Sequence, residues 1–468
     1  MKPDVSAASS LRLQAMLDAP ITSTLLRLAW PNLLMLLAQS STGLIETWFL
    51  SKLGTDVLAG TALVIPVLML MQNMSQGAMG GGISAAVARA LGGGRNREAN
   101  ELVLQAVLLN GALGLIFSLA LFAFGPQLYR AMGADGAALA AALAYSNVLA
   151  GGLGLMWVMN ALASVVRGTG NMLLPGMVIC GGALLLVPLS PCLIFGLGPF
   201  PELGVSGAGW AMVAYYAGGA TVLGWYCLSG HNAARLQKGR AQWPLMRSIL
   251  AVGGLATLNP LLTNGLIASI TALIGAYAGT AALAGYGTAA RLEYLVIPIA
   301  FGIGAPLVAM VGANIGAGQL QRAVRIALTG GALAFVIAEA LGLAAALWPL
   351  AWMRLFSSDP QTLAVGSTYL RTTGPLFGFF GLGFTLYFAS QGAGRLVWPL
   401  TAGVVRLAVA VGAGWLVLHL TGSLQGLFFA SATGMFLYGV ITLTAIVRGA
   451  WFPPLPSGNL STFKTDTA

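Results

Sequence analysis

The chain has 468 residues, of which only 7% are charged, and its mean hydropathy is +0.85. Soluble domains carry about 25% charged residues, so water-soluble and disordered proteins are excluded, and the 64 glycines follow no collagen period. Long continuous apolar runs indicate an all-α membrane protein, since a β-barrel shows short alternating segments. The net charge of +10 is spread thinly between these runs, so we expect no nucleic-acid partner.

Twelve apolar runs are long enough to cross a membrane, which takes about 20 residues each. They lie near 28–50, 57–88, 102–124, 138–165, 173–197, 204–228, 248–277, 281–315, 323–347, 361–390, 396–419 and 424–447. We see no cleavable signal peptide before the first run, because that segment has charges and no apolar core.

The basic residues divide unevenly between the two faces that twelve spans create. One face carries Lys2, Arg12, Arg27, Arg89, Arg95, Arg97, Arg167, Arg235, Lys238, Arg240, Arg247, Arg322, Arg325, Arg395, Arg448 and Lys464. The other face carries only Lys52, Arg130 and Arg354. Because basic residues gather on the cytoplasmic side, both termini are expected to be cytoplasmic.

The two halves of the chain repeat one pattern at an offset of about 224 residues. RGTGN at 167–171 recurs as QGAGR at 391–395, and Asp135 recurs as Asp359. GGG at 92–94 recurs as GAG at 316–318, and LAG at 58–60 recurs at 283–285. An offset of six helices makes the halves parallel repeats, a common design of secondary transporters.

This repeat predicts two pseudo-symmetric six-helix lobes around a central cavity. We expect a cytoplasmic N-terminal segment at 1–26, an N-terminal lobe at 27–228 and a basic cytoplasmic linker at 229–247. A C-terminal lobe at 248–447 and a cytoplasmic tail at 448–468 complete the chain. Two lobes that rock about a cavity can expose it to each side in turn.

Six strings in this order resemble the multidrug and toxic compound extrusion (MATE) family, closest to its prokaryotic DinF-like members. They are LIETW at 44–48, LGTDVLAG at 53–60, RGTGN at 167–171, LGVSGAG at 203–209, YGTAARLE at 286–293 and VGANIGAG at 311–318. The resemblance runs from about Leu26 to Val447. It implies cation-coupled antiport that exports amphipathic, usually cationic compounds across the cytoplasmic (inner) membrane. Lipid flippases of the same superfamily share the general fold, so a lipid or lipid-linked substrate is the main alternative.

Several positions depart from the family pattern. Glu46 stands where the first helix of the family normally carries Asp, which keeps a carboxylate on a longer arm. The Asn and Asp of helix 5 align with Leu186 and Ser190, and a helix 6 Thr aligns with Met212. The Glu of helix 7 and the Asp of helix 10, used in another branch, align with Asn264 and Phe380. Both recognised cation sites are therefore depleted, which favours protons over sodium as the coupling ion.

Glu46 is the predicted cation-coupling residue. A charge inside the hydrocarbon is costly, and a carboxylate there suits a group that binds and releases a proton. The alternatives are an ion pair with Lys52 and snorkelling toward water.

Four further charges in the second lobe form a predicted intramembrane network of Arg291, Glu293, Arg371 and Arg406. Arg291 and Glu293 are two apart on one helix and cannot face each other, so we expect Glu293 to pair with Arg371 or Arg406. The pair is expected to be structural. If the three arginines instead face the cavity together, they would suit the phosphates of a flippase substrate.

Polar residues inside spans are expected to face the interior, where they line the substrate path or join helices. The candidates for the substrate cavity are Gln39, Asn73, Asn160, Asn264, Met212 and Phe380. No phosphate-binding motif, metal cluster or set of catalytic groups is visible, so we expect no enzyme, cofactor or metal. The expected partners are small amphipathic compounds and membrane lipids, and we expect a monomer.

Overall fold

The computed structural model describes residues 5–451, all of whose regular elements are helices. Of the predicted terminal segments, 1–4 and 452–468 lie outside the described residues. The first half contains α1 (Val5–Asp18), α2 (Ile21–Ser51), α3 (Thr55–Gln72), η1 (Asn73–Met79), α4 (Gly80–Gly92), α5 (Asn96–Ala131), α6 (Gly136–Gly168), α7 (Leu173–Phe195) and α8 (Val205–Leu228).

The second half begins with α9 (Trp243–Ala256), which the predicted lobe boundary at 247/248 divides. It continues with α10 (Leu258–Tyr294), α11 (Val296–Gly316), α12 (Leu320–Leu347), α13 (Pro349–Met353), α14 (Pro360–Thr373), η2 (Gly374–Leu376), α15 (Phe377–Ala393), α16 (Val397–Leu407), η3 (Ala408–Ala413), α17 (Gly414–Thr421) and α18 (Leu424–Val447). The segments η1 and η3 are π-helical and η2 is a 3-10 turn.

These helices make twelve membrane crossings. Nine stretches of the described helices are long and apolar enough to cross, but one of them, Trp243–Gly316, has 74 residues. Gly279 breaks this stretch with φ 76° and ψ −174°, which only glycine adopts readily, so it forms two crossings. The helix α8 and the continuous run α14–η2–α15, which are not among the nine stretches, supply the last two of the twelve crossings.

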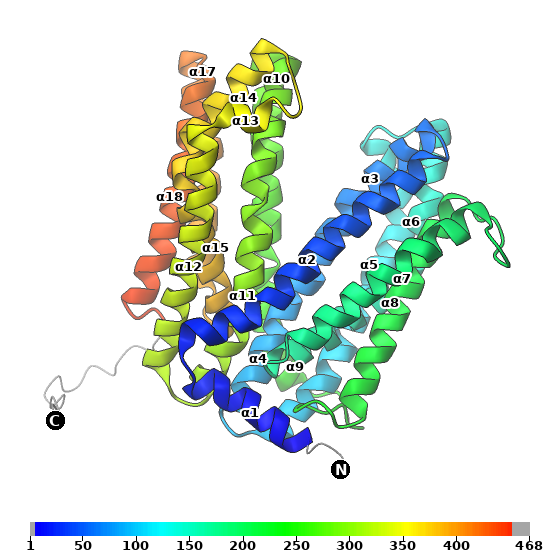
Figure 1. The fold of residues 1–468 in the computed structure, drawn as a ribbon, viewed down its shortest axis with the longest axis vertical. Helices are drawn as coiled ribbons and strands as arrows, with labels where there is room; N and C mark the ends of the chain where they lie inside the picture. The colour runs from blue at the N-terminus through cyan, green and yellow to red at the C-terminus, as the bar shows by residue number, and fades with distance from the viewer. Residues whose placement is uncertain (1–4, 452–468) are drawn as a thin grey trace, which may run out of the picture.

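The twelve crossings form two bundles that meet near the end of the molecule where α1 and the last turn of α18 lie, and they lean apart toward the other end (Figure 1). We call the first end the terminal face and the other the distal face. Near the terminal face α4 packs directly on α11. Gly92 lies against the carbonyl of Ala313 and Gly316 against the carbonyl of Arg89, with no room for a Cβ at either glycine.

These interlobe contacts follow the repeat predicted from the sequence, since Arg89 is 224 residues from Ala313 and Gly92 is 224 residues from Gly316. The same symmetry appears inside the lobes. Gly60 packs on the backbone of α6 at Ala138, and Gly285 packs on the backbone of α14 at Thr362, the equivalent position. The glycines at these matched positions therefore serve close helix packing.

The first crossing of each half starts against the opposite lobe. Leu33 of α2 packs on Gly302 of α11, while Ile249 and Gly253 of α9 pack on Gly82 of α4. Ile249 belongs to the apolar core of the first bundle. The two lobes are thus joined by exchanged helix ends as well as by the chain linker.

The predicted linker packs on the first lobe. The Gln105 side chain donates to the carbonyl of Arg240 and accepts from the backbone N–H of Gln242, each at 3.0 Å. The backbone N–H of Arg235 donates to Asn100 Oδ1 at 2.7 Å. Through these contacts α5 fixes the start of α9.

The matched residues Asp135 and Asp359 both precede a helix, but only Asp359 caps one with its side chain. Asp359 Oδ2 accepts from the Thr362 backbone N–H at 2.8 Å and from its hydroxyl at 2.6 Å. These hydrogen bonds hold the pKa of the exposed Asp359 below its usual range. The first repeat has Ala138 in place of Thr362, and Asp135 makes no side-chain cap.

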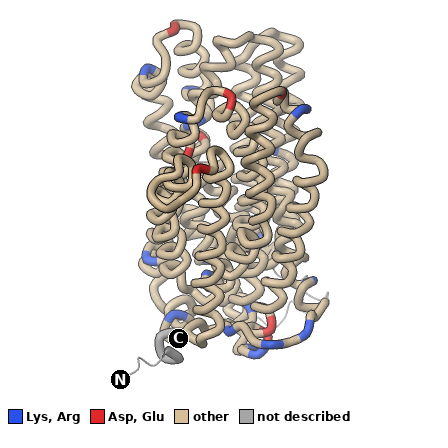
Figure 2. The backbone as a smooth tube through the Cα atoms, turned by 90° about the vertical axis from the view of Figure 1, so that its right-hand side faces the viewer, with Lys and Arg blue, Asp and Glu red and all other residues tan. Residues whose placement is uncertain are grey.

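Basic side chains gather toward the terminal face (Figure 2). Among those predicted for this face, Lys2 and Lys464 lie outside the described residues. Arg167, which the sequence placed with the loop residues, lies instead in the last turn of α6 and is 3% exposed. Its burial is a correction, because a loop arginine would be hydrated.

Candidate functional site

Glu46 lies in the distal half of α2 and is buried in the first lobe, with 9% of its surface exposed. Its Oε1 accepts a hydrogen bond from the Tyr145 hydroxyl of α6 at 3.3 Å. No basic side chain forms an ion pair with it in the part of the chain that is described. Glu46 is therefore a carboxylate in an apolar setting that accepts a hydrogen bond from a phenol.

The alternative that Glu46 pairs with Lys52 is wrong. Lys52 Nζ lies over the Trp48 ring instead, 5.0 Å from its centroid. This arrangement is a cation–π contact, and it keeps the ammonium group near the exposed end of the helix.

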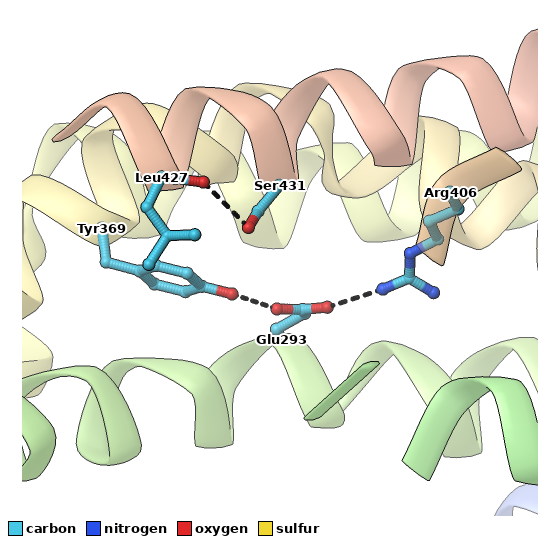
Figure 3. Close-up of polar contacts among 5 residues, drawn as sticks. All are labelled: Glu293, Tyr369, Arg406, Leu427 and Ser431. Atoms are coloured by element: carbon cyan, nitrogen blue, oxygen red, sulfur yellow. Dashed lines mark hydrogen bonds and ion pairs between the residues drawn. The ribbon is translucent and has the colours of Figure 1, made fainter. Parts of the chain in front are cut away.

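A second buried carboxylate lies in the other lobe. Glu293 of α10 accepts from the Tyr369 hydroxyl of α14, and its other oxygen lies 3.2 Å from Arg406 Nη2 of α16 (Figure 3). Both side chains of the ion pair are 7% exposed. The predicted partner of Glu293 is thus Arg406 rather than Arg371.

Aromatic rings enclose the guanidinium of this ion pair. Its central carbon lies 4.1 Å from the Phe380 centroid and 5.8 Å from that of Tyr438. Beside the pair, Ser431 Oγ of α18 donates to the Leu427 carbonyl (Figure 3). Phe380, predicted as a cavity residue, is 1% exposed and packs under Arg406.

The other two members of the predicted charge network do not join this pair. Arg291 is exposed and lies over the Phe356 ring, 5.8 Å from its centroid. Arg371 is exposed in the last turn of α14 and makes no ion pair within residues 5–451. The structure therefore does not gather the three arginines into one basic cavity.

Asn160 is the predicted polar candidate with the most contacts. It is 1% exposed on α6, and its Nδ2 donates to Ser75 Oγ at 3.1 Å and to Gln72 Oε1 at 3.4 Å. Gln72 and Ser75 lie at the junction of α3 and η1. This amide joins the second and fourth crossings.

The remaining candidates are dispersed. Gln39 is partly exposed beside the Tyr215 hydroxyl of α8, and Met212 is partly buried one turn earlier on that helix. Asn73 is exposed at the start of η1. Asn264 is exposed on α10, where its Nδ2 donates to the Pro260 carbonyl at 2.8 Å.

The tyrosines of the two carboxylate sites are not among the predicted site residues, although they occupy equivalent positions in the two repeats. Tyr145 and Tyr369 are 224 residues apart, the same offset as the matched motifs. Each occupies the fourth crossing of its lobe and donates to a buried glutamate. A tyrosine in an apolar run carries no signal by itself, but a polar side chain at both positions of a repeat does.

An apolar groove runs between α7 and α8 in the first lobe. Its lining includes Met177, Leu185, Leu189 and Val222, with Tyr215 as a polar residue among them. Such a surface suits the apolar part of an amphipathic molecule.

A family model described as MatE matches residues 31–192 and 256–416, which is more than half of the chain. The chain belongs to the MATE family. It is therefore a membrane-embedded, multi-pass transporter rather than an enzyme, and transporters of this family use no cofactor.

Curated relatives include one named for a substrate. An "FAD transporter" of Shewanella oneidensis is 28% identical over 372 residues, covering 78% of this chain and 81% of the relative. A "probable multidrug resistance protein NorM" of Thermotoga maritima is 26% identical over 390 residues, covering 81% and 82%. The "multidrug resistance protein PmpM" of Pseudomonas aeruginosa is 26% identical over 385 residues, covering 79% and 76%.

Solved structures share the fold. A mutant of the Vibrio cholerae MATE transporter VcmN superposes with a TM-score of 0.83 at 21% identity, over 94% of this chain and 98% of that one. A MATE structure titled as outward-facing gives 0.80 at 22% identity, over 91% and 96%. These comparisons confirm the all-α fold of twelve crossings in two six-helix lobes.

Proposed function

We propose that this MATE transporter exports small amphipathic, cationic organic compounds in exchange for protons. It works as a monomer in the cytoplasmic (inner) membrane, in contact with membrane lipids. The observation that carries the coupling is Glu46, a buried carboxylate with a phenol donor and no basic partner among the described residues. Such a group changes charge by taking up a single proton, without a partner that must also move.

The orientation follows from charge. The loops and helix ends of the terminal face carry most of the basic residues, so this face lies on the cytoplasmic side. The bundles meet there and lean apart at the distal face (Figure 1). We therefore assign this arrangement to the state closed to the cytoplasm, and the opposite state arises when the lobes separate at the terminal face.

The domain roles follow from the same arrangement. The segment 27–228 forms the lobe that holds the proton site, and 248–447 forms the lobe that moves against it. The stretch 229–247 connects the two lobes on the cytoplasmic side. The terminal segments 1–26 and 448–468 are assigned to the same side.

Protons are favoured over sodium by the surroundings of Glu46. In the fifth and sixth crossings, the family positions that would add oxygen ligands are occupied by Leu186, Ser190 and Met212. Leu186 and Ser190 are buried. A sodium ion needs several oxygens at once, whereas a proton needs one. The candidates Gln39, Asn73, Asn160 and Asn264 then remain for substrate contact.

An anionic substrate is the second candidate, and it rests on the relative named as an FAD transporter. A lipid-linked substrate is less favoured, because Arg406 is taken up by Glu293 and Arg291 lies over Phe356. Both alternatives need free cationic side chains along the path. Of the three intramembrane arginines, Arg371 makes no aromatic or acidic contact in the described chain, and it is exposed.

The test is transport in inside-out membrane vesicles that contain the chain. Uptake of ethidium, and separately of FAD, is followed under a proton gradient or a sodium gradient alone. We expect ethidium uptake that requires the proton gradient. Glu46→Gln should abolish this uptake without lowering the amount of protein in the membrane, since an amide cannot exchange a proton.

Glu202→Gln is the matched control, because Glu202 is exposed in the distal loop after α7, and it should transport normally. Undiminished uptake by Glu46→Gln would remove Glu46 from the mechanism. Uptake driven by sodium alone would contradict proton coupling. FAD movement without ethidium movement would establish the second candidate.

A further inference from the structure

Arg167 is a buried cation without an anionic partner. It is 3% exposed, its Nη2 donates to Ser164 Oγ at 2.8 Å, and its Nη1 has no hydrogen-bond partner. No Asp or Glu forms an ion pair with it in the described part of the chain. A buried charge is costly unless it is paired, so this guanidinium requires a counter-ion.

The free edge of Arg167 faces a small cavity between the two lobes. The first lobe contributes Gln76, Ser84 and Arg167 to its lining, and the second contributes Phe301, Val308 and Phe388. The cavity is small, with about 10 Å³ open to the centre of a water-sized particle, which is room for a single small occupant. Because both lobes form its walls, the cavity in this shape exists only while the lobes meet at the terminal face.

The polar lining of this cavity is rich in unpaired donors. Besides Arg167 Nη1, the buried Gln76 Nε2 and Ser84 Oγ have no hydrogen-bond partner. The amide oxygen of Gln76 is already occupied, since it accepts from Gln72 Nε2 at 2.9 Å. Three unsatisfied donors around one space, one of them cationic, match the requirements of an anion.

Glycines allow the helix backbones to pack closely around this cavity. Gly77, Gly80 and Gly81 line the cavity, and a Cβ at Gly80 would lie 2.5 Å from Ser164 Oγ, the partner of Arg167. Gln76 lies within the π-helical segment η1, a type of interruption that is frequent at functional sites.

A second cation strengthens the positive potential at this interface. Arg89 of α4 donates from Nη1 to the Gly392 carbonyl of the other lobe at 2.9 Å, so it also uses a neutral acceptor. A water molecule could satisfy donors in the cavity, but it would leave the charge of Arg167 uncompensated. An anion satisfies both requirements.

We propose that this interlobe cavity binds a small inorganic anion such as chloride, held by Arg167, Ser84 and Gln76. The bound anion bridges the lobes and stabilises the state that is closed at the terminal face, since a ligand favours the state that forms its site. It acts as a regulator of the conformational equilibrium and is separate from the proton site at Glu46.

The first experiment measures binding directly with the purified full chain. Radioactive chloride binding is measured in a gluconate buffer, because gluconate is a bulky organic anion. We expect saturable binding and a thermal unfolding temperature that rises by several degrees as chloride replaces gluconate. Arg167→Met should lose both effects, and Ser84→Ala should weaken binding several-fold.

Arg325→Met is the matched control, since Arg325 is exposed on α12 and its loss removes the same charge. The control should bind chloride as the unaltered chain does. Absence of saturable binding, or equal binding by Arg167→Met, overturns the proposal. If Arg167→Met does not fold, the chloride affinities of Ser84→Ala and Gln76→Leu provide the test. An affinity that is unchanged in both variants overturns the proposal.

The second experiment measures the conformational effect. Spin labels at Met132→Cys and Ser358→Cys, in a chain whose three native cysteines are replaced by serine, report the separation of the lobes at the distal face. We expect chloride to favour the long distance and gluconate to favour a shorter one, and Arg167→Met should not respond. Displacement of chloride by phosphate at equal concentration would show that the site prefers a phosphate group and would overturn the assignment to chloride. Because neither measurement involves transport, both hold whatever the substrate is.

Discussion

At the scale of single residues, Glu46 and Glu293 accept a hydrogen bond from the same kind of donor but differ in whether a positive charge lies beside them. Each accepts from a tyrosine of the fourth crossing in its lobe, and only Glu293 also has a guanidinium. A carboxylate with a fixed counter-charge holds its helices together through the ion pair, whereas Glu46 has no such pair among the described residues. We therefore propose different roles for these two related sites.

The ion pair of Glu293 predicts a large loss of stability when one partner is removed. Arg406→Met leaves a buried carboxylate uncompensated, which costs about 3–5 kcal/mol, and it also empties the space over Phe380. The double variant Arg406→Met with Glu293→Gln removes both charges and should recover most of this loss. Thermal unfolding of the four proteins in one detergent measures the cycle.

An exchange of the two side chains, Glu293→Arg with Arg406→Glu, should restore folding better than either single change. Arg291→Met is the control, because Arg291 is exposed and lies outside the pair. Additive effects of the two single changes would show that the pair does not stabilise the lobe. Transport should follow stability in this series, since we propose that the pair is structural.

The sequence could predict which charges lie in the membrane, but only partly which of them meet. Spacing along one helix excluded contact between Arg291 and Glu293 and left Arg371 and Arg406 as alternatives. The choice depends on how α14 and α16 rotate about their axes, which the packing of Phe380 and Tyr438 determines. The burial of Arg167 could not be predicted, because a basic residue beside a Gly-rich loop has the same sequence pattern whether buried or hydrated.

At the scale of helices, the glycines of α4 and α11 determine how closely the lobes approach. Gly92→Val would place side-chain atoms against the Ala313 carbonyl, and Gly316→Val would do the same at the Arg89 carbonyl. Either change should therefore shift the protein away from the state closed at the terminal face. The spin-label pair at positions 132 and 358 should report a shorter mean distance.

Because the repeat makes the two contacts equivalent, the two valine variants should act alike. Gly254→Val on α9 is the control, since a Cβ there meets no atom within 4 Å, and it should leave the distance unchanged. A distance that stays long in both interface variants would show that the crossing of α4 and α11 does not limit closure. The repeat motifs predicted that these two glycines are equivalent, although they could not show that each packs on the backbone of the other lobe.

At the scale of the whole molecule, transport by alternating access requires the lobes to separate at the terminal face in each cycle. A covalent link across that face should therefore stop transport without damaging either lobe. Ala88 and Gly312 offer such a link, because a Cβ at Gly312 would lie 3.1 Å from the Ala88 Cβ, within about half an ångström of the roughly 3.5–4.5 Å found in disulfides.

In a chain freed of its three native cysteines, Ala88→Cys with Gly312→Cys should lose ethidium transport on oxidation and recover it on reduction. Each single-cysteine variant should transport equally under both conditions. Glu46 is unchanged in the linked protein, so a loss of transport would come from the link and not from damage to the proposed proton site. If the oxidised protein still transports, the lobes do not part at this crossing, and the route must open within one lobe, where the groove between α7 and α8 is the first place to look.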